Sequence, residues 1–146
     1  VDAKIGWVPG RPEIMQAGKQ GKQARTRFEI VERFAGVTLL KCLPDTDRKQ
    51  QIRAHLQHAG LAPVGDACYG GQLLMLSKIK RNYRPRRDGT EQPLIDRTAL
   101  HYSKLNFTHP MTCEPVGIES PLPKDMQVAL KYLRKYAPAR DGSQDL

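Results

Sequence analysis

The stretch 47–56, Asp-Arg-Lys-Gln-Gln-Ile-Arg-Ala-His-Leu, constrains the fold most strongly, because it combines a helix signal with dense charge. The polar residue at 46 or 47 can cap the N-terminus of a helix, and Gly60 is placed to end it. Ile52 and Leu56 lie four residues apart, so one apolar stripe faces a core. We therefore predict a helix from about residue 47 to residue 59.

The first turn of this helix is crowded with Arg48, Lys49, Gln50 and Gln51. A helix N-terminus carries partial positive charge, so cations there are mildly unfavourable unless an anion lies nearby. One interpretation is a phosphate or a carboxylate bound at this end. The other is a solvated helix start that tolerates a small repulsion.

Arg53 lies at the border of the apolar stripe. An arginine there either extends to water or pairs with an acid, because an unpaired buried guanidinium is costly. The turn at Gly65 and Asp66 follows the helix, and Asp66 can accept hydrogen bonds from backbone amides or contact a substrate. Tyr69 can either pack inside the fold or stack on a base.

Composition indicates one globular domain of 146 residues, with 39% hydrophobic and 27% charged residues. The net charge of +9 predicts a polyanionic partner, nucleic acid first and an acidic membrane surface second. No apolar run approaches the length that spans a bilayer, and the first ten residues lack signal-peptide character. Three widely spaced cysteines suit a reducing cytoplasm, so we expect a cytoplasmic location.

The segments before the helix predict strands. A weak alternation over residues 1–8 ends at the break 9–12, and a basic loop follows over 16–27. This loop contains Lys22 and Arg25 and suits a phosphate backbone, although an ordinary solvated loop has the same composition. Residues 28–34 and 37–43 are rich in β-branched and aromatic residues and predict an antiparallel hairpin.

The segments after the helix predict a mixed architecture. A basic stretch within 72–93 has a short helical start, and its cations and aromatic ring suit RNA. Strands are expected within 94–107 and at 116–119, followed by a helix over 124–136 and a frayed tail over 137–146. We therefore predict an α+β fold, mainly antiparallel β-sheet with flanking helices.

Other chemistries lack a supporting pattern. His55 and His58 lie three residues apart, but no Cys-x-x-Cys or His-Glu-x-x-His spacing accompanies them, so no metal site is predicted. No glycine-rich phosphate loop follows a strand, and a Cys-His nucleophile pair has no local signature. We expect no cofactor.

Several segments together resemble the RluA-like pseudouridine synthases, the ribosomal large-subunit type. That family has a Gly-Arg-Thr-His-Gln-Ile-Arg-x-His-Leu run, then Gly-Asp-x-x-Tyr-Gly, Leu-His-Ala, Phe-x-His-Pro and Pro-Leu-Pro. Similar segments follow in the same order here, at residues 47–56, 65–70, 100–102, 107–110 and 121–123. The ordered combination is far more specific than any one motif.

This resemblance implies isomerisation of uridine to pseudouridine in structured RNA, ribosomal or transfer RNA, without a metal or cofactor. The target base would be flipped from its stack, and an aspartate of a His-Arg-Leu-Asp-type motif would take part in breaking the glycosidic bond. The resemblance assigns Arg53 as the partner of that aspartate and Leu56 as a wall of the pocket. The predicted RNA contacts are Arg48, Lys49, Gln50, Gln51, Lys22, Arg25, Lys80, Arg81 and Arg84.

The chain departs from the family in one large respect, because no His-Arg-Leu-Asp motif occurs in it. Asp45, Asp47 and Asp66 do not match the motif. Within the run that is present, Asp47, Lys49 and Gln50 replace glycine, threonine and histidine. We therefore expect residues 1–136 to be the C-terminal portion of a catalytic domain, inactive alone, whose missing N-terminal half is a partner.

The alternative is a non-catalytic, basic RNA-binding module. Arg53 distinguishes the two hypotheses. In an enzyme fragment it should point, unpaired, at an open pocket edge where an upstream aspartate would lie. In a binding module it should be neutralised by an internal acid such as Asp66 or extend into solvent. We expect the unpaired arrangement.

Overall fold

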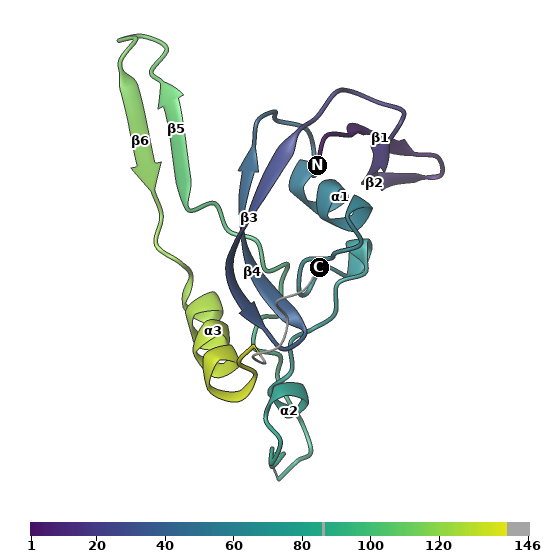
Figure 1. The fold of residues 1–146 in the computed structure, drawn as a ribbon, viewed down its shortest axis with the longest axis vertical. Coiled ribbons are helices and arrows are strands. Elements are labelled where there is room, and N and C mark those ends of the chain that lie inside the picture. The colour runs from purple at the N-terminus through teal and green to yellow at the C-terminus, as the bar shows by residue number, and fades with distance from the viewer. Residues whose placement is uncertain (86, 140–146) are drawn as a thin grey trace.

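A computed structural model describes residues 1–85 and 87–139. The order of its elements is β1 (Lys4–Val8), β2 (Arg11–Gly18), β3 (Thr26–Phe34), β4 (Val37–Pro44), α1 (Gln51–His58), a 3₁₀ turn (Ala67–Tyr69), α2 (Leu76–Ile79), β5 (Lys104–Thr108), β6 (Pro115–Glu119) and α3 (Lys124–Tyr136). The predicted α+β class is confirmed. The strands form three separate antiparallel hairpins, β1–β2, β3–β4 and β5–β6 (Figure 1).

The first hairpin extends further than the sequence suggested. The expected loop over 16–27 is wrong at its start, because Gln16 to Gly18 complete β2 and pair with β1. The sequence of β2 does not show the alternation of buried and exposed residues that is typical of a strand, because its neighbouring residues Ile14 and Met15 are both buried. Residues 19–25 then lead into β3.

The second hairpin agrees with its prediction. β3 and β4 pair from Phe34–Val37 at the turn to Thr26–Pro44 at the open end. Gly36 adopts a φ of 79° in the turn, which is why glycine suits this position. The register shifts between Ile30 and Glu32, so the hairpin carries one bulge.

Helix α1 begins later than predicted. Gln50 precedes it in a left-handed conformation with a φ of 55°, so residues 49 and 50 form a turn and neither predicted cap residue serves as the cap. The predicted end is confirmed. Gly60, with a φ of 75°, donates its N–H to the carbonyl of Gln57, and Leu61 donates to Leu56, which is a Schellman motif.

Helix α3 has the predicted bounds, and it buries Met126, Leu130 and Leu133. The predicted tail begins too early. Ala137 is buried and its carbonyl accepts the N–H of Ala35, beside the β3–β4 turn. Residues 140–146 of the predicted tail lie outside the described residues.

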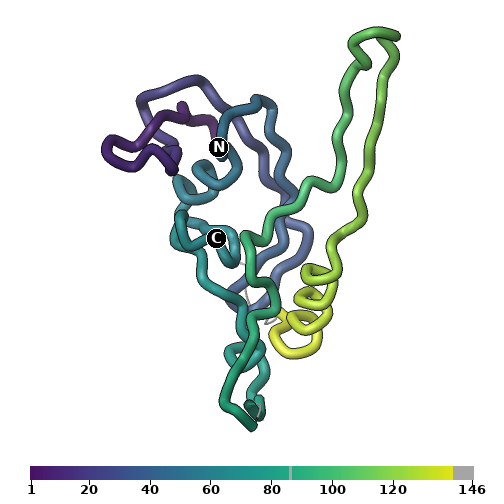
Figure 2. The backbone as a smooth tube through the Cα atoms, turned by 180° about the vertical axis from the view of Figure 1, so that it is seen from behind, coloured from purple at the N-terminus to yellow at the C-terminus, as the bar shows by residue number. Residues whose placement is uncertain are grey.

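The residues that the structure describes form two separate buried apolar clusters. One joins α3 to Phe34, Leu74 and Ile95, and the other joins β1 and β2 to Ala54 and Tyr69. The β5–β6 hairpin extends away from both, and the segment around α2 forms the opposite end of the molecule (Figures 1 and 2). None of the described helices is both long and apolar enough to cross a bilayer.

The turn at 63–71 supplies a test of this packing. A Cβ on Gly71 would overlap the carbonyl oxygen of Pro63 and lie 2.8 Å from the backbone nitrogen of Asp66. We expect Gly71→Ala to lower the free energy of unfolding by more than about 2 kcal/mol, because backbone atoms would have to move. Urea denaturation followed by circular dichroism measures the change.

The matched control is Gly36→Ala. Gly36 also lies in a turn, but nothing lies within 4 Å of its added Cβ, so only the positive φ is penalised. We expect a loss of about 1 kcal/mol. Equal losses for the two variants would contradict the described packing of the 63–71 turn.

Candidate functional site

The guanidinium of Arg53 forms a two-point ion pair with the carboxylate of Asp66. Both the Nε–Oδ2 and the Nη2–Oδ1 distances are 2.7 Å. The side chain of Asp66 is 1% exposed and that of Arg53 is 23% exposed. The hydrogen bond to Asp66 raises the pKa of Arg53 further above its ordinary value, so this side chain is a fixed cation.

The expectation that Arg53 is unpaired is therefore wrong. The turn at Gly65 and Asp66 folds back toward α1 and places the Asp66 carboxylate against the Arg53 guanidinium. Sequence spacing could not show this contact, because it joins residues 13 positions apart across a glycine-rich turn. The Nη1 atom has no hydrogen-bond partner in the described part of the chain.

The aromatic ring of Tyr69 packs against the guanidinium of the ion pair, whose central carbon lies over the ring at 4.6 Å from its centre. The Tyr69 hydroxyl accepts the Met15 N–H at 3.0 Å and lies 2.6 Å from Gln50 Oε1, to which it can donate. Burial raises the pKa of the Tyr69 phenol. With 2% exposure, Tyr69 packs inside the fold, and the interpretation that it stacks on a base is wrong.

Two glutamines predicted to contact RNA are used inside the fold. Gln50 donates its side-chain amide to the carbonyl of Glu13, which attaches α1 to β2. Gln51 is 4% exposed and donates to the carbonyl of Arg25 and the hydroxyl of Thr26. Gln51 therefore has almost no surface for RNA, and we remove it from the interface.

His55, considered from the sequence only as a metal ligand, is a structural residue. Its Nδ1 lies 2.8 Å from the Thr26 hydroxyl and its Nε2 lies 3.0 Å from the Ala3 carbonyl. Since the carbonyl can only accept, Nε2 carries the proton and Nδ1 accepts from Thr26. Burial lowers the pKa of His55, so the ring is neutral. His55 follows Gln51 by four residues, so the two side chains share one face of the helix. This spacing is the feature of the sequence that could have indicated their shared structural role.

A cleft of about 590 Å³ lies beside Arg53. Residues 44–53 form one wall, on which Arg48 and Lys49 are exposed together with Asp45 and Asp47. Leu100, Tyr102 and Leu105 form the other wall. A cleft with cations on one side and apolar or aromatic surface on the other is suited to a nucleotide, which has both a phosphate and a ring.

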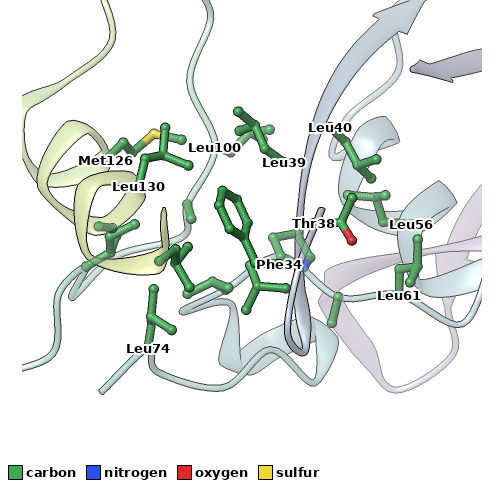
Figure 3. A pocket seen from close by; sticks show the side chains of 18 of the residues that line it. Phe34, Thr38, Leu39, Leu40, Leu56, Leu61, Leu74, Leu100, Met126 and Leu130 are labelled. Carbon is green, nitrogen blue, oxygen red and sulfur yellow. The ribbon is translucent and has the colours of Figure 1, made fainter. Parts of the chain in front are cut away.

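A second cavity, of about 260 Å³, is apolar and lies between β3–β4 and the surrounding helices (Figure 3). Leu56 lines this cavity together with Leu40 and Leu61, and Met126 and Leu130 close its other side. Arg53 and Leu56 therefore line different cavities. The predicted role of Leu56 as a wall of the substrate pocket stays a prediction.

The other predicted RNA contacts are dispersed. Arg25 is exposed but pairs with Asp2 at 2.7 Å, and Lys22 is exposed beside β1. Lys80 lies over the ring of Tyr136 at 5.5 Å. Lys80 and the exposed Arg81 and Arg84 follow α2 in the sequence. The segment around α2 lies at the end of the molecule opposite the β5–β6 hairpin (Figure 1). The structure does not gather these cations into one patch.

Comparison with known proteins defines the class. No protein-family model matches the chain. An uncharacterized RNA pseudouridine synthase of Bacillus subtilis is 36% identical over 92% of the chain. Ribosomal large subunit pseudouridine synthase C of Escherichia coli is 36% identical over 83% of it, and synthase D of Xylella fastidiosa 36% over 92%.

These matches confirm the resemblance predicted from the sequence. The chain belongs with the RluA-like pseudouridine synthases and matches part of such a protein. It spans just over a third of the length of these relatives: 39% of the Bacillus protein, 35% of the Escherichia protein and 39% of the Xylella protein.

The Arg53–Asp66 pair can be tested by stability. We expect Asp66→Asn to lower the free energy of unfolding by about 2–3 kcal/mol, because it leaves a largely buried guanidinium without a charged partner. Asp2→Asn is the control, since the Asp2–Arg25 pair is exposed to solvent. Urea denaturation measures both, and an Asp66→Asn protein as stable as Asp2→Asn would contradict a structural role for the pair.

His55 makes stability depend on pH. Its folded-state pKa lies below the ordinary value of 6.5, so below about pH 6.5 the unfolded chain takes up a proton before the folded chain does. We expect this contribution to be complete above pH 6.5 and to be lost as pH falls from there through the lower folded-state pKa. His55→Gln should flatten the pH dependence measured by urea denaturation, whereas His58→Gln, at an exposed position, should not. Equal slopes for the two variants would exclude His55 as the cause.

Proposed function

We propose that this chain forms part of the catalytic domain of an RNA pseudouridine synthase, which isomerises uridine to pseudouridine in structured RNA. The similarity to proteins named RNA pseudouridine synthases, over 80–92% of the chain, carries this proposal. Two of the named relatives are ribosomal large subunit enzymes, which supports ribosomal RNA as the substrate class.

The cleft beside Arg53 supports an RNA substrate. Arg48 and Lys49 are exposed at its wall and have no ion pair among the described residues. They are therefore available for phosphate oxygens. A uridine that leaves its stack would lie against the opposite wall, where Tyr102 and Leu105 offer aromatic and apolar surface.

Arg53 is the residue that we assign to the chemistry. Asp66 binds its Nε and Nη2, so the guanidinium is fixed and Nη1 is left for a second acceptor. We assign that place to the catalytic aspartate, contributed by a part of the protein outside this chain. The cation would hold the aspartate ionised while the bond from the ribose C1′ to N1 breaks and the bond to C5 forms. Asp66 is then a positioning residue.

Leu56 has a different proposed role. It lines the apolar cavity on the other side of α1, where it packs the helix that carries Arg53. We therefore propose that Leu56 holds the orientation of α1 and affects Arg53 through the helix.

The Arg53–Asp66 pair itself favours a second candidate, a non-catalytic RNA-binding module. Such a module needs Arg53 only as part of an internal ion pair, which the geometry provides. The two candidates predict different activities. The enzyme candidate predicts that this chain turns over substrate when it is combined with the rest of the protein, and the binding module predicts that it does not.

A tritium-release assay on ribosomal RNA labelled at C5 of uridine separates them. We expect no release by this chain alone and release when an N-terminal half bearing the aspartate is supplied. In the complete protein, Arg53→Lys should lower kcat at least about tenfold, because lysine cannot keep the two-point contact with Asp66 and also reach a second carboxylate. Arg134→Lys, at an exposed pair with Glu32, is the matched control and should retain kcat.

Each result has a definite meaning. RNA binding without release in any combination would support the binding module. Release by this chain alone would contradict the assignment of the aspartate to another part of the protein. Unchanged kcat in Arg53→Lys would remove Arg53 from the chemistry.

A further inference from the structure

The indole of Trp7 is a large apolar surface left open on a basic protein. Trp7 lies near the end of β1 and is 60% exposed. It is the one tryptophan of the sequence. One face of its ring is covered by Lys49, whose Nζ lies 4.5 Å from the ring centre. That contact leaves the opposite face and the outer edge for a ligand.

The position of Trp7 in β1 explains why this ring is not part of the core. Ile5 and Trp7 are two residues apart, so they share a face of the hairpin, and Trp7 pairs with Met15 across it. Ile5 and Met15 are buried, whereas Trp7 extends past the end of that covered face. The indole therefore continues the apolar face of β1–β2 out to the surface.

The surroundings of Trp7 carry more cations than acids, since Asp47 accompanies Arg48 and Lys49 on the same wall of the cleft. Lys49 lines the cleft beside Arg53 and its Nζ also lies over the indole, so this lysine connects Trp7 to that cleft. Arg48 donates its Nε to the carbonyl of Gln23 at 3.1 Å, next to Lys22. In the described part of the chain, no acidic side chain pairs with Lys22, Arg48 or Lys49.

We propose that Trp7 is a base-stacking residue, which holds an unpaired RNA base next to the nucleotide in the cleft while Lys49 meets the adjoining phosphate. This inference rests on the proposed function and names a contact for its RNA. An aromatic ring flanked by cations is the arrangement that binds single-stranded nucleic acid, because every base has a stacking face.

The full 146-residue chain provides a direct readout, since its tryptophan fluorescence, excited selectively over that of the tyrosines, comes from this single indole. The probe is an RNA hairpin with an unpaired uridine-containing loop, and a fully paired RNA duplex of the same length is the comparison. We expect the hairpin to quench Trp7 fluorescence, and the duplex to quench it much less, because paired bases cannot stack on a side chain. Filter retention measures total RNA binding in parallel.

Variants test the contribution to affinity. We expect Trp7→Ala to weaken hairpin binding about tenfold, and Trp7→Phe to keep most of the affinity because phenylalanine still stacks. Lys49→Ala should lower the slope of log Kd against log salt by about 0.7, the value for one single-strand phosphate contact. Val128→Ala, at an exposed apolar position on α3, is the control and should bind like the unchanged chain.

The outcomes separate this inference from the proposed function. Filter retention of the hairpin without quenching, or equal affinity of Trp7→Ala and the unchanged chain, would overturn stacking and leave RNA binding intact. Equal loss in Trp7→Ala and Trp7→Phe would also overturn it, because the role of the indole would then be structural. Absence of hairpin binding by the unchanged chain would overturn the stacking inference, whereas the proposed function is decided by tritium release from the complete protein. If Trp7→Ala fails to fold, the quenching of the unchanged chain decides.

Discussion

The ion pair between Arg53 and Asp66 holds together the part of the molecule on which its function depends. Asp66 lies in a turn that has no regular sheet contact, and its two hydrogen bonds fasten this turn to α1. Tyr69 extends the contact from the same turn, with its ring under the guanidinium and its hydroxyl on β2. Three segments far apart in the sequence therefore meet at one arginine. A buried ion pair adds little net stability, but it fixes the geometry of the groups that it joins.

Much of the fold was predictable where local patterns were complete. The β3–β4 hairpin and α3 follow from clean strand and helix periodicity, and Gly60 ends α1 through its positive φ. Local patterns failed where tertiary contacts decided the outcome. β2 buries two neighbouring residues, so the two-residue alternation typical of a strand is not visible in its sequence. The start of α1 shifts to Gln51, because Gln50 is held in a left-handed conformation with its side chain hydrogen-bonded to β2.

The candidate site was predictable in its location but only partly in its details. Residues 47–53 of the run do line a cleft, with Arg48, Lys49 and Arg53 among them. The resemblance treated these side chains as one functional set, whereas the structure divides them by direction around the helix. Gln51 and His55 point into a buried hydrogen-bond chain that begins at Arg25 and ends at Ala3. A linear motif cannot show which of its residues serve the fold and which face a ligand.

The β5–β6 hairpin has a consequence for handling this chain in solution. It extends away from the rest of the molecule (Figure 2), and all residues of its two strands except Val116 are exposed. Leu105 and Ile118 face each other across it, so it presents an apolar ladder to solvent. Among the described strands, neither outer edge of this hairpin is paired. Exposed edges of this kind are where separate molecules add to one another as extra strands, so the solubility of the chain at high concentration is governed by this hairpin rather than by its helices.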